Sequence, residues 1–210
     1  MEKIIFPKNT EKAVQMEAYM KHHFRFAGVP KPERALIQKS LMKESQKLPV
    51  PELLSLVADY YAREEREYQY LAIDLVQKNV KRLSFENLVW LRELVSQKEW
   101  WDSIDSWQKV YSTWGKLHQE IEAVFQLFEG QEDFWLRRIA ITLQLGFKEQ
   151  TDVTLLERAI DADRSTKEFF IQKAIGWALR DYSKTNPLWV KEQLTKELSK
   201  LATREASKYL

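Results

Sequence analysis

A carboxylate set among indole rings is the part of this sequence best suited to chemistry. The stretch 100–107 reads Trp-Trp-Asp-Ser-Ile-Asp-Ser-Trp, and no other stretch places so much aromatic surface around an acid. In a helix, residues four positions apart lie about 40° apart around the axis, because each residue advances by about 100°. Trp101 and Asp105 would therefore share one strip of a helix. An acid in this place either caps or supports the helix or takes part in a reaction.

The residues around this stretch predict a helix from Trp100 to about Leu117. Neither Gly nor Pro occurs between Leu91 and Trp114. The apolar residues recur at helical spacing and predict one seam that faces the core, formed by Trp100, Ile104, Trp107, Tyr111 and Trp114. The neighbouring strip is polar except at its first residue, so we expect its members to lie at the edge of the core: Trp101, Asp105, Gln108 and Ser112.

A second group of residues suits an anionic polymer. Lys173, Trp177, Arg180 and Lys184 recur at intervals of four, three and four residues, beside an apolar seam. A basic helix face that carries an aromatic ring can bind a phosphate backbone and stack on a sugar or base. The alternative is a solvated helix face with one stray Trp. Two further cations, Arg137 and Arg138, lie in the N-terminal half of the predicted helix 133–147, near free amide donors.

The composition excludes several kinds of active site. The 210 residues include no Cys, which excludes thiolate catalysis, disulfides and Cys-ligated metals. The histidines, His22, His23 and His118, have no ligand-like spacing, and no P-loop or GxGxxG motif occurs. We therefore expect no metal and no cofactor. The net charge of +2 does not by itself indicate nucleic acid, so any anion-binding surface must come from the local distribution of charge.

The N-terminal residues lack the apolar segment of a signal peptide, and no apolar run approaches membrane-spanning length. These features predict a soluble cytoplasmic protein. The length is sufficient for one large domain or two small ones.

Helical periodicity fills nearly the whole chain, and no convincing alternation of a strand occurs, so we predict an all-α protein. The first helix is expected to begin at Asn9-Thr10 and to end at Gly28. The last segment is expected to break once near Ala202-Thr203. The predicted helices span residues 10–28, 32–47, 51–62, 66–79, 84–97, 100–117, 120–128, 133–147, 153–161, 167–184 and 187–210.

Faint internal repeats relate these helices to one another. The segment around Ala72 matches the segment around Ala140, a separation of 68 residues, and half of that separation leads to Ser106. The segment 168–173 matches 133–138 with an offset of 35 residues. A period of 34–35 residues with two helices per period is typical of an α-solenoid. The alternative is an irregular helical bundle.

Three motifs, in this order, resemble the AlkD family of bacterial alkylpurine DNA glycosylases. They are Trp-Trp-Asp-Ser-Ile-Asp-Ser at 100–106, Trp-Leu-Arg-Arg at 135–138, and Phe-Phe-Ile-Gln-Lys-Ala-Ile-Gly-Trp-Ala-Leu-Arg at 169–180, which is followed by Lys-Thr-Asn-Pro at 184–187. The similarity extends over most of the chain, from Tyr19-Met20-Lys21 and Gly28–Arg34 to Arg204-Glu205-Ala206.

The resemblance implies a single domain of HEAT-like helical repeats over residues 1–210, with a concave face that holds duplex DNA. It also implies removal of cationic N3- and N7-alkylated purines by cleavage of the glycosidic bond, without a metal or other cofactor. By motif position, Asp105 corresponds to the family's catalytic carboxylate, and Trp101 and Trp177 correspond to the indoles that flank the deoxyribose. Arg138 corresponds to the arginine at the lesion's backbone, and Tyr19 to a DNA-contacting tyrosine.

The expected partner is therefore double-stranded DNA that contains alkylated purines. We expect a monomer in the bacterial cytoplasm that acts at the nucleoid. The sequence departs from the family pattern at 28–32, Gly-Val-Pro-Lys-Pro, because polar side chains often precede the second proline there and Pro30 is apolar. The role of the Pro30 region and the preference among alkylated purines therefore stay open.

Two other functions use the same features. One is a non-catalytic binder of damaged or branched DNA on the same scaffold, and the other is a helical-repeat scaffold for proteins. Asp105 with both indoles favours an enzyme over a binder. The basic strip argues against a protein scaffold, which would favour an apolar or acidic groove.

Overall fold

Helices account for all the regular structure in the computed structural model, which describes residues 3–210. Thirteen α-helices and three short 3-10 helices occur within this described range, and no strand is found in it. The prediction of an all-α protein is confirmed. The chain divides into two compact units, Met1–Trp90 and Leu91–Leu210, and each is described by itself.

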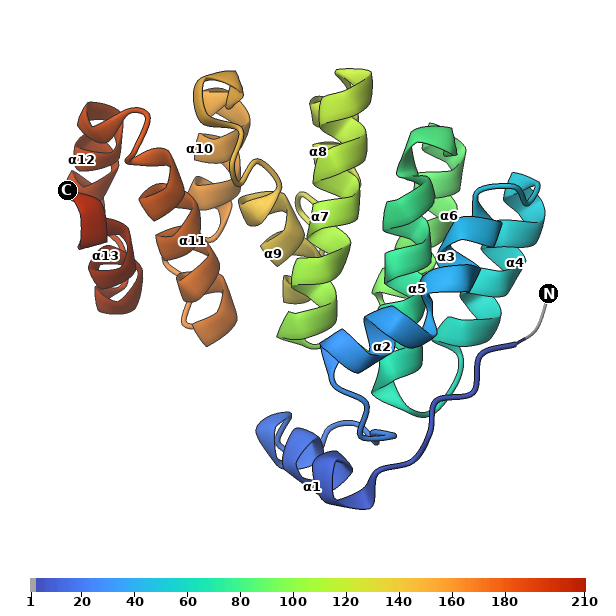
Figure 1. The fold of residues 1–210 in the computed structure, drawn as a ribbon. Helices are drawn as coiled ribbons and strands as arrows, with labels where there is room; N and C mark the ends of the chain where they lie inside the picture. Colours follow the sequence, from blue (N-terminus) through green and yellow to red (C-terminus); the bar gives the residue numbers. More distant parts are fainter. Residues whose placement is uncertain (1–2) are drawn as a thin grey trace. The chain divides into compact units, whose positions relative to one another are not determined.

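Unit 1 is built around α4 and α5, which pack against each other (Figure 1). Helix α3 also packs on α5, and α2 packs on α3. Leu53 and Val57 of α4 and Leu71 and Leu75 of α5 are fully buried and form the centre of this core. The elements are α1 Thr10–Tyr19, α2 Lys31–Ile37, α3 Lys39–Ser45, α4 Val50–Tyr61, α5 Arg66–Asn79, η1 Val80–Arg82 and α6 Phe85–Val95, the last of which continues past Trp90.

The loop that follows α1 is fixed by a buried acid. The Glu67 carboxylate accepts hydrogen bonds from the backbone N–H groups of Ala27, Gly28 and Val29 at 2.9–3.0 Å. Gly28 has φ +89°, and a Cβ atom there would lie 2.1 Å from the Asn9 carbonyl oxygen. Gly28 is therefore a tight turn within a loop, not the end of a long helix.

Unit 2 consists of helix pairs in two layers. Helices α7, α9, α11 and α13 contact one another in that order, while α8 packs on α7, α10 on α9 and α12 on α11 (Figure 1). The elements are α7 Trp101–His118, α8 Ile121–Gln126, α9 Phe134–Thr142, η2 Lys148–Gln150, α10 Val153–Ala162, α11 Phe169–Tyr182, α12 Pro187–Thr195, α13 Lys200–Ala206 and η3 Ser207–Tyr209.

The predicted period is visible in the helix starts. Helices α5, α7, α9 and α11 begin at Arg66, Trp101, Phe134 and Phe169, which gives spacings of 35, 33 and 35 residues. We call α7, α9, α11 and α13 the inner helices of unit 2. Side chains at equivalent positions of successive inner helices are therefore brought together.

Several predicted boundaries are wrong. The first helix ends at Tyr19 because Lys21 and His22 adopt φ values of +52° and +59°, which a right-handed helix cannot continue. The predicted helix 32–47 is two helices, which meet at Gln38. The predicted helix 133–147 ends at Thr142.

The last segment breaks at 196–199, not near 202. Lys196 is extended, and the Ser199 side chain accepts a hydrogen bond from the Ala202 N–H and so starts a new helix. Within residues 3–210, none of the helices combines the length and the apolar character that crossing a bilayer requires.

Candidate functional site

Asp105 and Arg138 form a bidentate ion pair in unit 2. Arg138 Nε donates to Asp105 Oδ1 at 2.9 Å, and Nη2 donates to Oδ2 at 3.1 Å. Arg138 Nη1 donates to the carbonyl oxygen of Phe170 at 2.6 Å. The Arg138 side chain is 6% exposed, whereas that of Asp105 is 25% exposed. The arginine is therefore enclosed, and the carboxylate keeps one side open to solvent.

Two opposing effects set the pKa of Asp105. Burial, the larger effect, raises the pKa of this carboxyl above its usual value. The charge and hydrogen bonds of Arg138 act in the opposite direction, and the nearby charge of Asp102 adds to the increase. The ionised form of Asp105 therefore depends on Arg138.

The two predicted indoles come from helices on either side of α9, the helix that carries Arg138. Trp101 is the first residue of α7, one turn before Asp105, and is partly exposed. Trp177 lies in the middle of α11 and is also partly exposed. Because α9 packs on both α7 and α11, Arg138 lies on the helix between the acid and the second indole.

The apolar seam of α7 is confirmed except at its first residue. Ile104, Trp107, Tyr111 and Trp114 are buried. Trp100 is extended (φ −165°, ψ 161°) and precedes the helix, so it does not belong to the seam.

Trp100 instead belongs to an aromatic cluster at the N-terminal ends of three inner helices. Its ring lies 5.7 Å from that of Trp135 and 5.3 Å from that of Phe170, and the last two rings are 4.8 Å apart. The cluster joins the N-terminal ends of α7, α9 and α11 and so holds them in place. These ends lie about one turn before Asp105 and Arg138.

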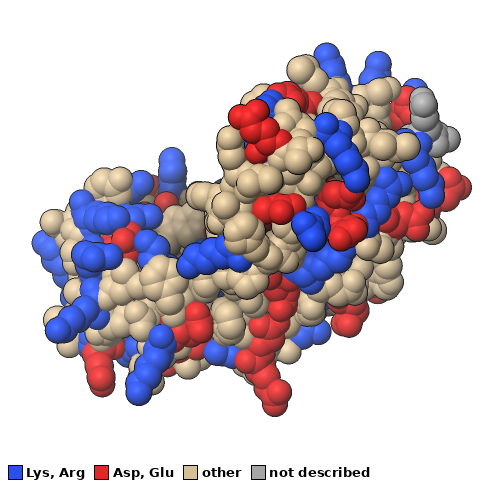
Figure 2. All heavy atoms as spheres, turned by 90° about the horizontal axis from the view of Figure 1, so that it is seen from below, with Lys and Arg blue, Asp and Glu red and all other residues tan. Residues whose placement is uncertain are grey.

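The cations of the predicted basic strip contact the C-terminal segment. Lys173 Nζ lies 3.2 Å from Glu205 Oε1, and Arg180 Nη1 lies 2.7 Å from Glu205 Oε2. Lys184 Nζ lies 4.8 Å from the centre of the Tyr209 ring. Figure 2 shows Lys and Arg side chains gathered over the C-terminal end of unit 2, on the left of the view.

Arg137 is held in an internal network. Its Nε donates to Asp163 Oδ2 at 2.9 Å, and its Nη1 donates to the carbonyl oxygens of Gln131 and Glu132 at 2.6 and 2.7 Å. These contacts give Arg137 a structural role, and its contact with DNA stays a prediction.

Tyr19 belongs to unit 1, as the last residue of α1. It is 70% exposed and lines an apolar hollow of about 200 Å³ with Met16, Met20, Phe26 and Tyr70. Its contact with DNA stays a prediction, and the site in unit 2 is described without it.

Sequence reasoning missed Glu99. Burial raises the pKa of Glu99 to about 8, and a hydrogen bond with Asp133 and the charge of that residue act in the same direction. Asp133 caps α9, where its carboxylate accepts a hydrogen bond from the Trp135 N–H. The two acids lie 34 residues apart, so the repeat period was the signal that could have paired them.

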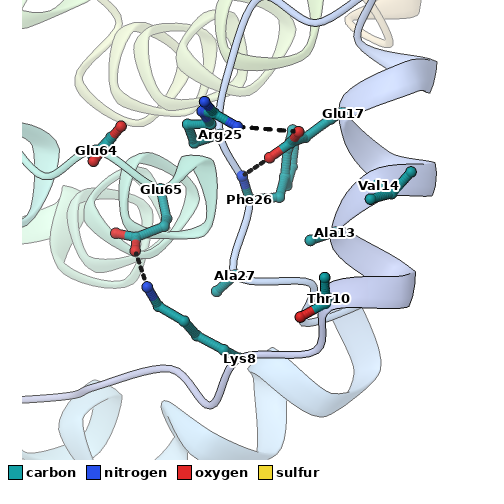
Figure 3. Close-up of a pocket in the computed structure, with 10 residues that line it drawn as sticks. All are labelled: Lys8, Thr10, Ala13, Val14, Glu17, Arg25, Phe26, Ala27, Glu64 and Glu65. Atoms are coloured by element: carbon teal, nitrogen blue, oxygen red, sulfur yellow. Dashed lines mark hydrogen bonds and ion pairs between the residues drawn. The ribbon is translucent and has the colours of Figure 1, made fainter.

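A larger hollow lies in unit 1, and none of the residues predicted to act lines it. It measures about 380 Å³, and Figure 3 shows its lining. Lys8 lies 3.9 Å from Glu65, and Arg25 lies 3.8 Å from Glu17, whose carboxylate also accepts from the Phe26 N–H. The cations Lys8 and Arg25 therefore pair with acids of the same hollow. Across the described range 3–210, no three metal-ligating side chains are arranged to hold a metal ion.

Comparisons with known proteins place these features in context. A family model described as DNA alkylation repair enzyme matches residues 3–210. A solved structure, described as a predicted DNA alkylation repair enzyme from Enterococcus faecalis, is similar over 99% of both chains, with 53% identity and a TM-score of 0.97. None of the curated proteins matches.

Two structures from Streptococcus mutans share the fold at lower identity. AlkD2 is 20% identical with a TM-score of 0.65, covering 86% of this chain and 98% of that one. The protein smu.31 of strain UA159 is 22% identical with a TM-score of 0.63, covering 84% and 97%. These matches concern the fold alone, and they confirm the predicted solenoid of HEAT-like helical repeats.

Proposed function

This chain belongs to the family of DNA alkylation repair enzymes, and we propose that it is a monofunctional DNA glycosylase. Its substrate is duplex DNA that carries a cationic N3- or N7-alkylated purine, and it hydrolyses the bond between that base and its deoxyribose. The observation that carries the proposal is the partly open Asp105 carboxylate, held by Arg138 one turn from Trp101.

The proposed reaction does not need a strong general acid. Alkylation at N3 or N7 gives the purine a positive charge, so the base leaves with the bonding electron pair and becomes neutral. The sugar then carries the positive charge as an oxocarbenium-like species, which a fixed carboxylate stabilises. A water molecule adds to the anomeric carbon, and Asp105 orients it and accepts its proton.

The indoles contribute to the same step. The face of an indole ring is electron-rich and attracts a cation by about 0.5–1 kcal/mol at exposed sites and by about 2 kcal/mol or more when desolvated. Trp101 is placed one turn from Asp105. Trp177 lies between Lys173 and Arg180 on α11, where phosphate contacts and a sugar-stacking ring share one face.

Arg138 acts through Asp105 in this proposal. Three of its nitrogen atoms donate to Asp105 and to the Phe170 carbonyl, and the side chain is 6% exposed. Little of the guanidinium is therefore open to a phosphate of the lesion. Its bidentate contact fixes the carboxylate and favours the ionised form against the effect of burial.

The test is release of free base from duplex DNA that contains 7-methylguanine. The proposal predicts release by the wild-type chain, none from undamaged duplex, and a large loss in Asp105→Asn. Binding to both duplexes is measured in parallel. Binding without release by the wild-type chain would identify a non-catalytic DNA binder, and absence of both would exclude a DNA function.

A further inference from the structure

Helix α13 packs against α11 at Gly176, the residue before Trp177. A Cβ atom at Gly176 would lie 2.5 Å from Cβ of Glu205 and 2.9 Å from the Ala202 carbonyl oxygen. Such distances leave no room for any side chain at position 176. The absence of a side chain there allows the backbone of α13 to approach α11 directly, which places Glu205 beside the face that carries Trp177.

Glu205 spans two turns of that face. Its Oε1 lies 3.2 Å from Lys173 Nζ and its Oε2 lies 2.7 Å from Arg180 Nη1. The two cations are seven residues apart, about 10 Å along the axis, and Trp177 lies between them at helical spacing. The carboxylate therefore holds the cation on each side of the indole.

The Glu205 carboxylate is enclosed, and the cations around it favour its charged form. Its side chain is 8% exposed, and Lys208 Nζ also lies 2.7 Å from Oε2, while Arg204 Nη2 is 4.0 Å from Oε1. The hydrogen bond from Lys208, with smaller contributions from Lys173, lowers the pKa of Glu205 to about 2. One negative charge thus lies within a group of four cations.

A negative charge in a surface that binds phosphates opposes binding, so electrostatic attraction does not account for Glu205. Its geometry does, because the two oxygen atoms contact cations on opposite sides of Trp177. We propose that Glu205 is a positioning residue, which fixes Lys173 and Arg180 so that a DNA strand is held with its sugar against Trp177.

This inference rests on the proposed function. Glu205 touches neither the reacting sugar nor the base, and acts through the two cations. Excision should depend on its length as well as on its charge, because a shorter carboxylate cannot reach both cations.

The decisive variant is Glu205→Asp, which keeps the charge and removes one methylene group. Single-turnover excision should slow by about 10- to 100-fold, since a misplacement of about 1 Å can cost about 100-fold in rate. The salt dependence of binding should stay unchanged, because no charge is lost. The matched control is Glu192→Asp on α12, an exposed site, which should excise at the wild-type rate.

A second background tests whether Glu205 acts through its cations. In a chain with Lys173→Gln and Arg180→Gln, adding Glu205→Asp should cause little further loss, because the residues through which it acts are gone. A wild-type rate in folded Glu205→Asp, or a full additional loss in the double-Gln background, would overturn the inference. If Glu205→Asp does not fold, Glu205→Gln replaces it, because an amide keeps the length but cannot accept from both cations.

The two proposals fail in distinguishable ways. An active wild-type chain with an unaffected Glu205→Asp variant rejects the positioning role alone. A wild-type chain that binds DNA but releases no base rejects the glycosylase. In that case Glu205→Asp should still weaken binding to duplex DNA by misplacing two cations, and an unchanged affinity would reject the positioning role as well.

Discussion

Asp105 and Arg138 occupy the same position in successive inner helices: each is the fifth residue of its helix, and their side chains meet at 2.9 Å. Lys173 is the fifth residue of the next inner helix, α11, and it contacts Glu205 of α13. The repeat therefore places charged residues at the same position of α7, α9 and α11, and each of them pairs with a residue of opposite charge on a neighbouring helix.

Removing Arg138 should shift the pH dependence of excision. Asp105 acts as a carboxylate, so activity falls as the pH falls through its pKa, which burial already raises. In Arg138→Met the opposing charge is lost, and the pKa of Asp105 rises further. The acidic limb of the single-turnover rate should move to higher pH, with a smaller shift in Arg138→Lys, which keeps the charge but not the bidentate geometry.

Arg137→Met is the control for this shift, because Arg137 contacts Asp163 and not Asp105. Its acidic limb should coincide with that of the wild-type chain. A rate for Arg138→Met that is reduced by the same factor at every pH would indicate a direct phosphate contact instead.

Local patterns identified most helices but could not show which long-range contacts interrupt them. The apolar residues Ala13, Met16, Met20 and Phe24 continue a helical period beyond Tyr19, where the helix ends. The buried carboxylate of Glu67, about 40 residues away, binds the amides that follow. Propensity cannot anticipate such a contact.

At the site, too, local patterns identified residues but not the distant residues that they contact. Asp105 and Arg138 were both identified from motifs, yet neither spacing nor composition indicated that they bind each other. Trp100 fits the period of the α7 seam, but it lies before the helix, where its ring makes a tilted contact with Trp135 and an edge-to-face contact with Phe170. Glu205 carried no local signal, because its role comes from helices α11 and α13 that meet at Gly176.

Glu99 should make the stability of the fold depend on pH. The pKa of Glu99 is about 8 in the folded chain, against 4.5 for an ordinary glutamate. The folded state therefore holds a proton that the unfolded state releases, and this contribution is complete below about pH 4.5 and lost as the pH rises through about 8. Denaturant unfolding at pH 5.5, 7 and 8.5 should show decreasing stability, with a flatter profile in Glu99→Gln.

The control for Glu99 is Glu93→Gln, which removes an exposed carboxyl of α6. Its profile should run parallel to that of the wild-type chain. Parallel profiles for Glu99→Gln and the wild-type chain would show that Glu99 titrates as an ordinary surface acid.

Lys184 should contribute one phosphate contact. It is exposed and lies over the Tyr209 ring, apart from the contacts of Glu205. Lys184→Ala should weaken binding to every duplex sequence and reduce the slope of log affinity against log salt by about 0.9. Lys191→Ala on α12, also exposed, should leave that slope unchanged, and equal slopes in both variants would make Lys184 a solvated side chain.

Chelation should not affect excision, because the proposed chemistry uses only Asp105, the indoles and water. Extended incubation with EDTA, followed by the 7-methylguanine release assay, should give the rate of the untreated chain. A clear loss that added zinc or magnesium restores would require a different mechanism.

Asp105→Asn addresses the chemical step itself. Asn is nearly isosteric and keeps one acceptor oxygen, so the change removes the charge while the shape persists. Loss of a preorganised electrostatic group costs roughly 2.7–4 kcal/mol of barrier, so excision should slow by about 10²–10³-fold. Binding to undamaged duplex should persist or improve, because a negative charge leaves a surface that meets phosphates.

The internal control is Asp102→Asn, in the first turn of the same helix. Asp102 interacts favourably with the N-terminal end of the helix dipole. Its loss should therefore reduce the stability of the fold more than it reduces the excision rate. Thermal unfolding and single-turnover excision of the two variants together separate the roles. If folded Asp105→Asn excises at the wild-type rate, the carboxylate does not stabilise the sugar, and the mechanism proposed for this site is wrong.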